Sequence, residues 1–131
     1  VQPFGNSLVT MTLTGNQIDT LLEQQFSGGN ATSPRILQPS EGFTYTWDFA
    51  APAGARVDIA SIRINGTPIV PTQAYRITVN SFLAEGGDNF AILREGTNRL
   101  GGALDIDALI AYLQARSPVA PVTAGRITRL N

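Results

Sequence analysis

The segment from Phe43 to Phe49 alternates strictly between aromatic and polar side chains. Successive side chains of a strand point to opposite faces, so Phe43, Tyr45, Trp47 and Phe49 share one face. A strand with one aromatic face needs a second layer to cover it, which favours a sheet packed against a helix. The row is also compatible with a stacking platform for bases or sugars, as in proteins that bind single strands.

A strand followed directly by a helix precedes this row. Residues 8–13 alternate with period two and predict a strand. Thr14 and Gln17 have the spacing of a capping box, which predicts that a helix begins there. The helix presents one apolar stripe, consisting of Ile18, Leu21, Leu22 and Phe26, and Gly28-Gly29-Asn30 ends it.

The rest of the chain predicts further strands and one more helix. Asn65-Gly66 is typical of a type I′ hairpin turn, so residues 67–70 are expected to pair back on residues 63–64. Asp105 is expected to cap a second helix that ends before Ser117-Pro118 and packs through Ile106, Leu109, Ile110 and Leu113. Additional strands are expected over residues 36–38, 57–64 (with a bulge), 75–79 and 126–130. Hairpin strands with two separated helices predict an α+β fold with a mixed or antiparallel sheet.

The length and composition of the chain exclude several classes of functional site. A chain of 131 residues forms one domain and can bury a core without disulfides or zinc. The absence of cysteine and histidine excludes zinc fingers, haem–histidine sites, cysteine nucleophiles and the Ser-His-Asp triad. Nine basic residues against ten acidic ones give no field that attracts nucleic acid or a membrane surface, and we expect neither as a partner. No stretch has the length of a membrane span or the pattern of a signal peptide.

The segment Asn80–Phe90 contains the strongest candidate site. Two glycines, Gly86 and Gly87, allow a sharp turn or a close approach to a ligand. Asp88 then presents a carboxylate that suits two neighbouring sugar hydroxyls, and Phe82 offers a face to a flat ring. The alternative is structural: Asp88 forms an Asx turn, and Phe82 and Phe90 belong to the core.

Other acidic residues predict no metal site. Asp105 and Asp107 lie at the start of a predicted helix, where carboxylates favour the helix dipole. Glu85 and Asp88 together supply too few oxygens for Ca²⁺ or Mg²⁺.

The eleven residues Asn80-Ser-Phe-Leu-Ala-Glu-Gly-Gly-Asp-Asn-Phe90 resemble the N-x-F-x-A-x-G-G-D-[GN]-[FY] signature of the C-terminal domain of 5′-nucleotidases. That family includes UDP-sugar hydrolases and 2′,3′-cyclic-nucleotide phosphodiesterases. Pro3-Phe4-Gly5-Asn6, Leu13-Thr14-Gly15 and the segment from Leu37 to Asp48 resemble further motifs of the same domain. The resemblance covers essentially the whole chain.

The resemblance implies roles for six residues. In the family two aromatic rings enclose the base; Phe82 matches one of them, and Ile36 stands where the other is expected. Without offset stacking, Ile36 loses about 0.5–1.5 kcal/mol beyond area burial. Asp88 matches the ribose-binding carboxylate of the Gly86-Gly87-Asp88 turn. Gln38 lies two positions after Ile36, where it could touch the edge of the base.

The resemblance also implies a parent protein. Family members join this domain to an N-terminal metallophosphatase domain with two divalent metal ions, which activate water for phosphate hydrolysis. We therefore expect residues 1–131 to be the nucleotide-recognition part of a secreted, periplasmic or cell-surface phosphohydrolase, truncated on its N-terminal side. We expect the chain alone to bind nucleosides at about millimolar dissociation constants and to lack hydrolase activity. The alternative is a vestigial or structural domain that serves packing or dimer contact.

Overall fold

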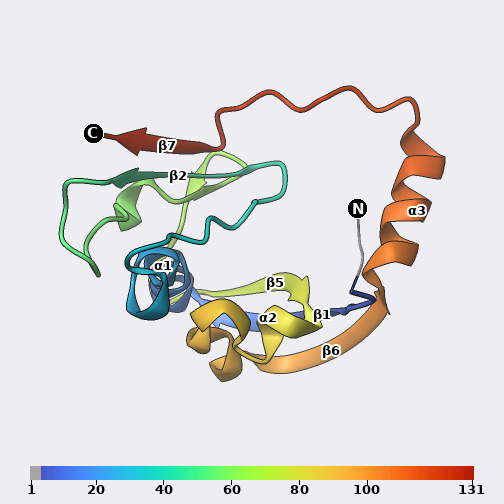
Figure 1. Ribbon diagram of the computed structural model, residues 1–131, viewed down its shortest axis with the longest axis horizontal. Coiled ribbons are helices and arrows are strands. Elements are labelled where there is room, and N and C mark those ends of the chain that lie inside the picture. The colour runs from blue at the N-terminus through green and yellow to red at the C-terminus, as the bar shows by residue number, and fades with distance from the viewer. Residues whose placement is uncertain (1–3) are drawn as a thin grey trace.

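The computed structural model describes residues 4–131 as two sheets joined by one central helix (Figure 1). In the first sheet, β1 (Ser7–Thr14) pairs antiparallel with both of its neighbours, β5 (Ala74–Asn80) and β6 (Thr97–Leu104). The second sheet has the order β4-β3-β2-β7 and contains the strands β4 (Thr67–Pro68), β3 (Arg63–Ile64), β2 (Phe43–Asp48) and β7 (Ile127–Leu130). Strand β7 runs parallel to β2, which makes this sheet mixed. The predicted α+β class is confirmed.

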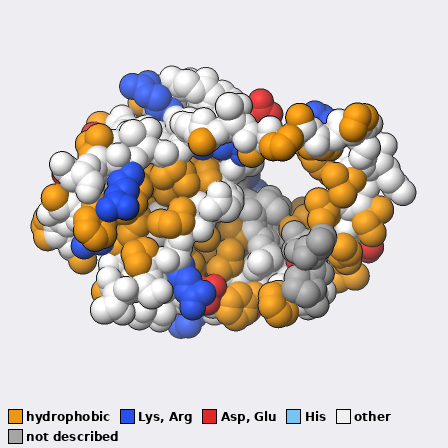
Figure 2. Space-filling model, turned by 45° about the horizontal axis from the view of Figure 1, so that its top comes forward, with side chains coloured by type: hydrophobic (Ala, Val, Ile, Leu, Met, Phe, Trp, Pro, Cys, Tyr) orange, Lys and Arg blue, Asp and Glu red, His pale blue; other side chains and the backbone are white. Residues whose placement is uncertain are grey.

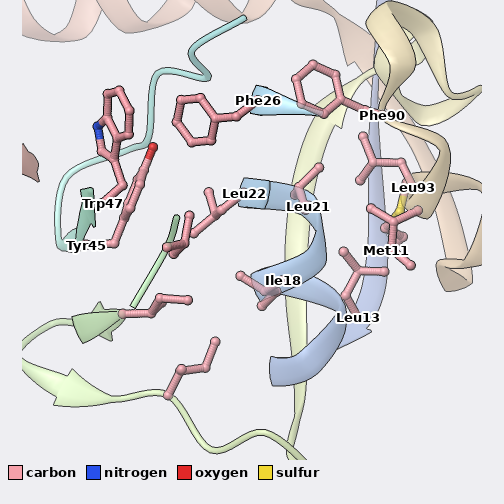
Figure 3. Close-up of a cluster of buried hydrophobic side chains, with 14 of the residues drawn as sticks. Met11, Leu13, Ile18, Leu21, Leu22, Phe26, Tyr45, Trp47, Phe90 and Leu93 are labelled. Atoms are coloured by element: carbon pink, nitrogen blue, oxygen red, sulfur yellow. The ribbon is translucent and has the colours of Figure 1, made fainter. Parts of the chain in front are cut away.

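Helix α1 (Gly15–Glu23) lies between the two sheets and supplies the centre of the core (Figure 3). Its apolar stripe faces β2 on one side and β1 on the other. The buried apolar side chains around it include Met11 and Leu13 of β1, Ile18, Leu21, Leu22 and Phe26 of the helical segment, and Tyr45 and Trp47 of β2. Each fully buried side chain of this size contributes about 1.5–3 kcal/mol relative to its exposed state.

The predicted capping box starts this helix. The Thr14 hydroxyl accepts a hydrogen bond from the amide of Gln17, and the Gln17 side chain accepts one from the amide of Thr14. The missing side chain of Gly15 admits the backbone carbonyl of Val70, which a Cβ at this position would overlap. Two 3₁₀ turns, Gln24–Phe26 and Gly28–Asn30, continue from the C-terminal end of α1.

The aromatic row of β2 is core and not a stacking platform. Tyr45 and Trp47 are buried, and the Trp47 ring stacks on Phe26 at 4.3 Å between centroids. Phe43 is half-buried against the same cluster. Phe49 differs from the prediction, since it follows the end of β2 and stays 46% exposed with the Arg129 guanidinium 4.5 Å from its ring centroid.

Two predicted strands differ from the observed structure, and one observed strand was not predicted. Residues 36–38 form no strand, because side-chain bonds and not a ladder hold them. Most of residues 57–64 is irregular: the Asp58 carboxylate accepts the amide of Ala60 and starts a 3₁₀ turn over Ile59–Ser61, so that only β3 remains. Strand β6 is absent from the predictions, because Gly101-Gly102 and exposed neighbours give it no alternating pattern. The turn at Asn65-Gly66 is confirmed, with φ of 51° and 82°.

The second predicted helix is present, but its apolar stripe is not core. Helix α3 (Asp105–Arg116) ends before Ser117-Pro118 as predicted, yet it contains no buried residue. Helix α3 stands apart from the sheets (Figure 1). An opening lies between the rest of the molecule and the segment that connects α3 to β7 (Figures 1 and 2). The cap also differs: Leu104 is the N-cap without a side-chain bond, and the Asp105 carboxylate accepts the adjacent amide of Ile106. No helix of residues 4–131 combines the length and hydropathy that crossing a bilayer requires.

Two carboxylates of α1 share a poorly solvated site. Asp19 and Glu23 lie one helical turn apart, and each has one buried carboxylate oxygen without a hydrogen-bond partner among the described residues. The other Glu23 oxygen accepts the amide of Val57 at 2.5 Å. Burial raises the pKa of Asp19 to about 6, with smaller contributions from the charges of Glu23 and Asp58.

This site predicts that the free energy of unfolding falls between pH 4 and 6. The raised pKa means that the folded chain holds a proton that the unfolded chain has released, so stability is lost as pH rises through this window and is level above it. Asp19→Asn should remove the decline and stabilise the domain by about 1 kcal/mol at pH 7, after allowance for solvent screening. Urea unfolding at four pH values measures both effects. A wild-type curve that rises from pH 4 to 6 in parallel with that of the variant would contradict the assignment.

Candidate functional site

A cleft of about 750 Å³ lies where three segments distant in the sequence meet. The first segment is the start of the chain before β1, the second is the irregular stretch after α1, and the third runs from the end of β5 through α2 (Ser81–Ala84) to Phe90. The lining side chains are Phe4, Asn6, Pro34, Arg35, Ile36, Leu37, Asn80, Phe82, Leu83, Asp88 and Phe90. The cleft therefore combines apolar walls with a few polar groups, which is the usual character of a small-molecule site.

The wall formed by residues 34–37 is held by the buried side chain of Gln25. Its Oε1 accepts the amide of Leu37 at 2.7 Å, and its backbone carbonyl accepts the amide of Arg35 at 3.1 Å. Its Nε2 donates to the carbonyl of Leu22 and to the hydroxyl of Tyr45, each at 3.0 Å. Gln25 thus fixes the backbone on both sides of Ile36 to the core, and Ile36 itself stays 38% exposed at the cleft.

The opposite segment begins with α2, a single helical turn that carries Phe82. The Asn80 side chain caps this turn by accepting the amide of Leu83 at 2.8 Å. The Phe82 ring is 51% exposed and packs against Gly87, where an added Cβ would lie 2.6 Å from two ring atoms. The absence of a side chain at Gly87 therefore leaves room for the ring in this position. Phe82 is not a core residue, whereas Phe90, which is only 1% exposed, is part of the core.

Asp88 occupies a backbone conformation that non-glycine residues seldom adopt. Its φ is 56° and that of the following Asn89 is 68°, and Gly86, two residues before Asp88, has a φ of 86°. The buried side chain of Asn30 stabilises this turn, because its Nδ2 donates to the carbonyl of Asp88 at 2.7 Å and to that of Gln24 at 3.0 Å. Left-handed backbone at non-glycine residues clusters at ligand sites.

The Asp88 carboxylate is exposed and accepts no hydrogen bond from residues 4–131. The Asx-turn alternative is therefore wrong, because the Asp88 group that makes the structural bond is its backbone carbonyl. The carboxylate is left with its acceptor sites directed to solvent at the cleft.

The structure brings together three of the six predicted site residues. Ile36, Phe82 and Asp88 line the one cleft, and Gly86 and Gly87 lie behind it as the support of Phe82 and of the turn. Gln38 lies elsewhere, in a cleft of about 410 Å³ formed with Pro39 and residues 122–127. Its predicted contact with the edge of a base stays a prediction.

Sequence reasoning did not find several cleft residues. Asn6 and Asn80 also line the cleft. Their positions in the motifs around Phe4 and Phe82 were the only sequence signal that could have identified them. Arg35 carried no signal beyond its position before Ile36. Within residues 4–131 no group of three or more metal-ligating side chains is placed to hold a cation.

Comparison with known proteins gives one consistent result. The family model described as "5′-nucleotidase, C-terminal domain" matches residues 1–95. A 5′-nucleotidase-related protein of Glossina morsitans morsitans is 33% identical over 98% of this chain and 24% of its own length. A crystal structure of a 5′-nucleotidase precursor from Thermus thermophilus matches with a TM-score of 0.82 and 37% identity, over 98% of this chain and 26% of that one.

The same fold also occurs in a protein that is described by a different activity. The Thermus thermophilus sulfate thiohydrolase SoxB matches with a TM-score of 0.69 at 20% identity, over 96% of this chain and 23% of that one, which shows the fold alone. The chain spans about a quarter of the length of these relatives. The matched family model covers most of the chain, and the chain belongs to the 5′-nucleotidase C-terminal domain family.

Proposed function

We propose that this domain recognises the nucleoside part of a nucleotide for a larger 5′-nucleotidase-like phosphohydrolase. The observation that carries the proposal is the single cleft lined by Phe82, Ile36 and Asp88, which come from distant parts of the sequence. An exposed aromatic ring and an apolar side chain suit the base of a nucleoside, and a carboxylate that accepts no hydrogen bond from residues 4–131 suits its ribose hydroxyls. Family membership supports the same interpretation.

The base binds between Phe82 and Ile36. Half of the Phe82 surface is open, so the ring can stack on a purine, and stacking contributes about 1–3 kcal/mol per base. Ile36 closes the other side by apolar contact without a ring quadrupole. We therefore expect the domain alone to bind a nucleoside weakly, with a dissociation constant of about 1 mM.

The ribose binds at Asp88. A carboxylate accepts hydrogen bonds from two adjacent hydroxyls, and the 2′- and 3′-hydroxyls of ribose have that spacing. The turn that carries Asp88 is fixed by Asn30, so the carboxylate is held in place before the ligand arrives. Such preorganisation lowers the entropic cost of binding.

Hydrolysis belongs to the rest of the proposed parent protein. The described residues do not fit a dimetal centre, since they contain no cluster of metal-ligating side chains. The proposed parent protein supplies the metallophosphatase domain with its two divalent ions, and its proposed location is secreted, periplasmic or at the cell surface.

Adenosine titration of the domain, followed by amide chemical shifts, tests the proposed site. Saturable shifts are expected around residues 86–88. Phe82→Ala should weaken binding at least tenfold through lost stacking, and Asp88→Asn should weaken adenosine more than 2′,3′-dideoxyadenosine. Phe49→Ala and Asp107→Asn are matched controls, because both side chains are exposed outside the cleft.

The vestigial or structural interpretation gives a different outcome. If adenosine produces no saturable shifts up to its solubility, the domain does not recognise nucleosides by itself and the proposal is wrong. Equal binding by wild type and Phe82→Ala would also contradict it, provided that both proteins are folded.

Gly87→Ala tests whether the glycine positions the Phe82 ring. The new methyl group would overlap two ring atoms and the Phe82 carbonyl, so the ring must move or the turn must shift. We expect a loss of about 1–3 kcal/mol in stability and at least fivefold weaker adenosine binding. Gly101→Ala is the control, because its Cβ would enter open space. Unchanged adenosine affinity in Gly87→Ala would show that the ring position does not matter.

A further inference from the structure

Eight of the nine arginines of this chain already have a partner among residues 4–131, and these partners define their roles. Some donate to backbone carbonyls, as Arg99 does to those of Ala84 and Leu93, and others lie over aromatic rings, as Arg129 does over Phe49. The engaged arginines are Arg56, Arg63, Arg76, Arg94, Arg99, Arg116, Arg126 and Arg129.

Arg35 is the exception. Within residues 4–131 its guanidinium donates no hydrogen bond, forms no ion pair and lies over no ring, and the side chain lines the cleft. Its backbone is nevertheless fixed, because its amide donates to the carbonyl of the buried Gln25. A guanidinium on an anchored backbone, with its donors unused, is available to a ligand in the cleft.

The position of Arg35 limits what it can reach. It directly precedes Ile36, and both side chains line the cleft that Phe82 also lines. The proposed base lies between Ile36 and Phe82, and we infer that a guanidinium on the same wall can reach the edge of that base. Asp88 is the other charged group of the lining, and no ion pair joins it to Arg35 among the described residues.

Resting on the proposed function, the geometry points to Arg35 as the residue that selects the base, in favour of 6-oxopurines such as hypoxanthine and guanine over adenine. A guanidinium is a fork of donors without an acceptor. The O6 and N7 atoms of a 6-oxopurine are two adjacent acceptors that this fork can bind together. Adenine has an amino group, a donor, at position 6. One N–H of the guanidinium would therefore face another donor and form no hydrogen bond.

Inosine and adenosine are the probes, because they differ in the purine at the 6-oxo or 6-amino position. Amide chemical shifts give dissociation constants of both nucleosides for the wild type, Arg35→Ala, Arg35→Lys and the control Arg63→Ala, an exposed arginine on β3. We expect the wild type to bind inosine about tenfold more tightly than adenosine. Arg35→Ala should bring this ratio close to one, mainly by weakening inosine. Arg35→Lys should also reduce the ratio, since lysine keeps the charge but loses the fork.

Several results would overturn the inference. If the wild type binds both nucleosides equally, the proposed function stands and base selection by Arg35 is wrong. If Arg35→Ala weakens the 5′-monophosphates of both nucleosides alike and leaves the inosine-to-adenosine ratio unchanged, Arg35 binds phosphate. If the wild type binds neither nucleoside, the proposed function fails and this inference fails with it.

Discussion

The cleft depends on three side-chain amides at the C-terminal end of α1. Gln25 holds the backbone around Ile36, Asn30 holds the turn at Asp88, and the Oε1 of Gln24 accepts the amide of Ile92 at 3.1 Å. Gln25 and Asn30 are buried, and a buried amide left without partners costs about 1–3 kcal/mol. Residues 34–37 and the turn at Asp88 lie outside the strands, so these bonds take the place of a strand ladder and attach both walls to one helix end.

The helix that provides these amides is itself the centre of the core. Packing on both faces fixes α1 between the sheets, as Figure 3 shows for Ile18, Leu21 and Leu22. The fold also occurs in a sulfate thiohydrolase, so the fold alone does not determine which ligand a domain of this kind binds. The proposed recognition chemistry therefore rests on exposed groups of the scaffold: Phe82, Asp88 and Arg35, whose guanidinium has no partner within residues 4–131.

The parts of the fold that local patterns specify could be predicted from the sequence. The capping box at Thr14, the turn at Asn65-Gly66 and strand β2 depend on residues close together in the chain. Strand β6 could not be predicted, because its pairing with β1 rather than any alternation sets its register. The spacing of the apolar residues of α3 correctly predicted a helix, but it could not show whether another element covers them, and none of the residues of α3 is buried.

The candidate site shows the same division. The motif from Asn80 to Phe90 pointed to Phe82 and Asp88, and the resemblance supplied Ile36; the cleft contains all three. The resemblance also placed Gln38 near the base, but Leu37, whose amide is bound by Gln25, precedes it, and Gln38 lines another cleft. Arg35 could not be selected, because nine arginines look alike in the sequence and only the three-dimensional contacts of the other eight set it apart.

Amide hydrogen exchange at Leu37 tests most directly whether buried side chains of the α1 end build the cleft. Leu37 lies in a segment without regular structure, and the acceptor of its amide is the Gln25 side chain. We predict that this amide exchanges at least about tenfold more slowly than an unprotected one. Exchange of Leu37 at the unprotected rate in a folded domain would show that the wall is not held, and would contradict a preformed cleft.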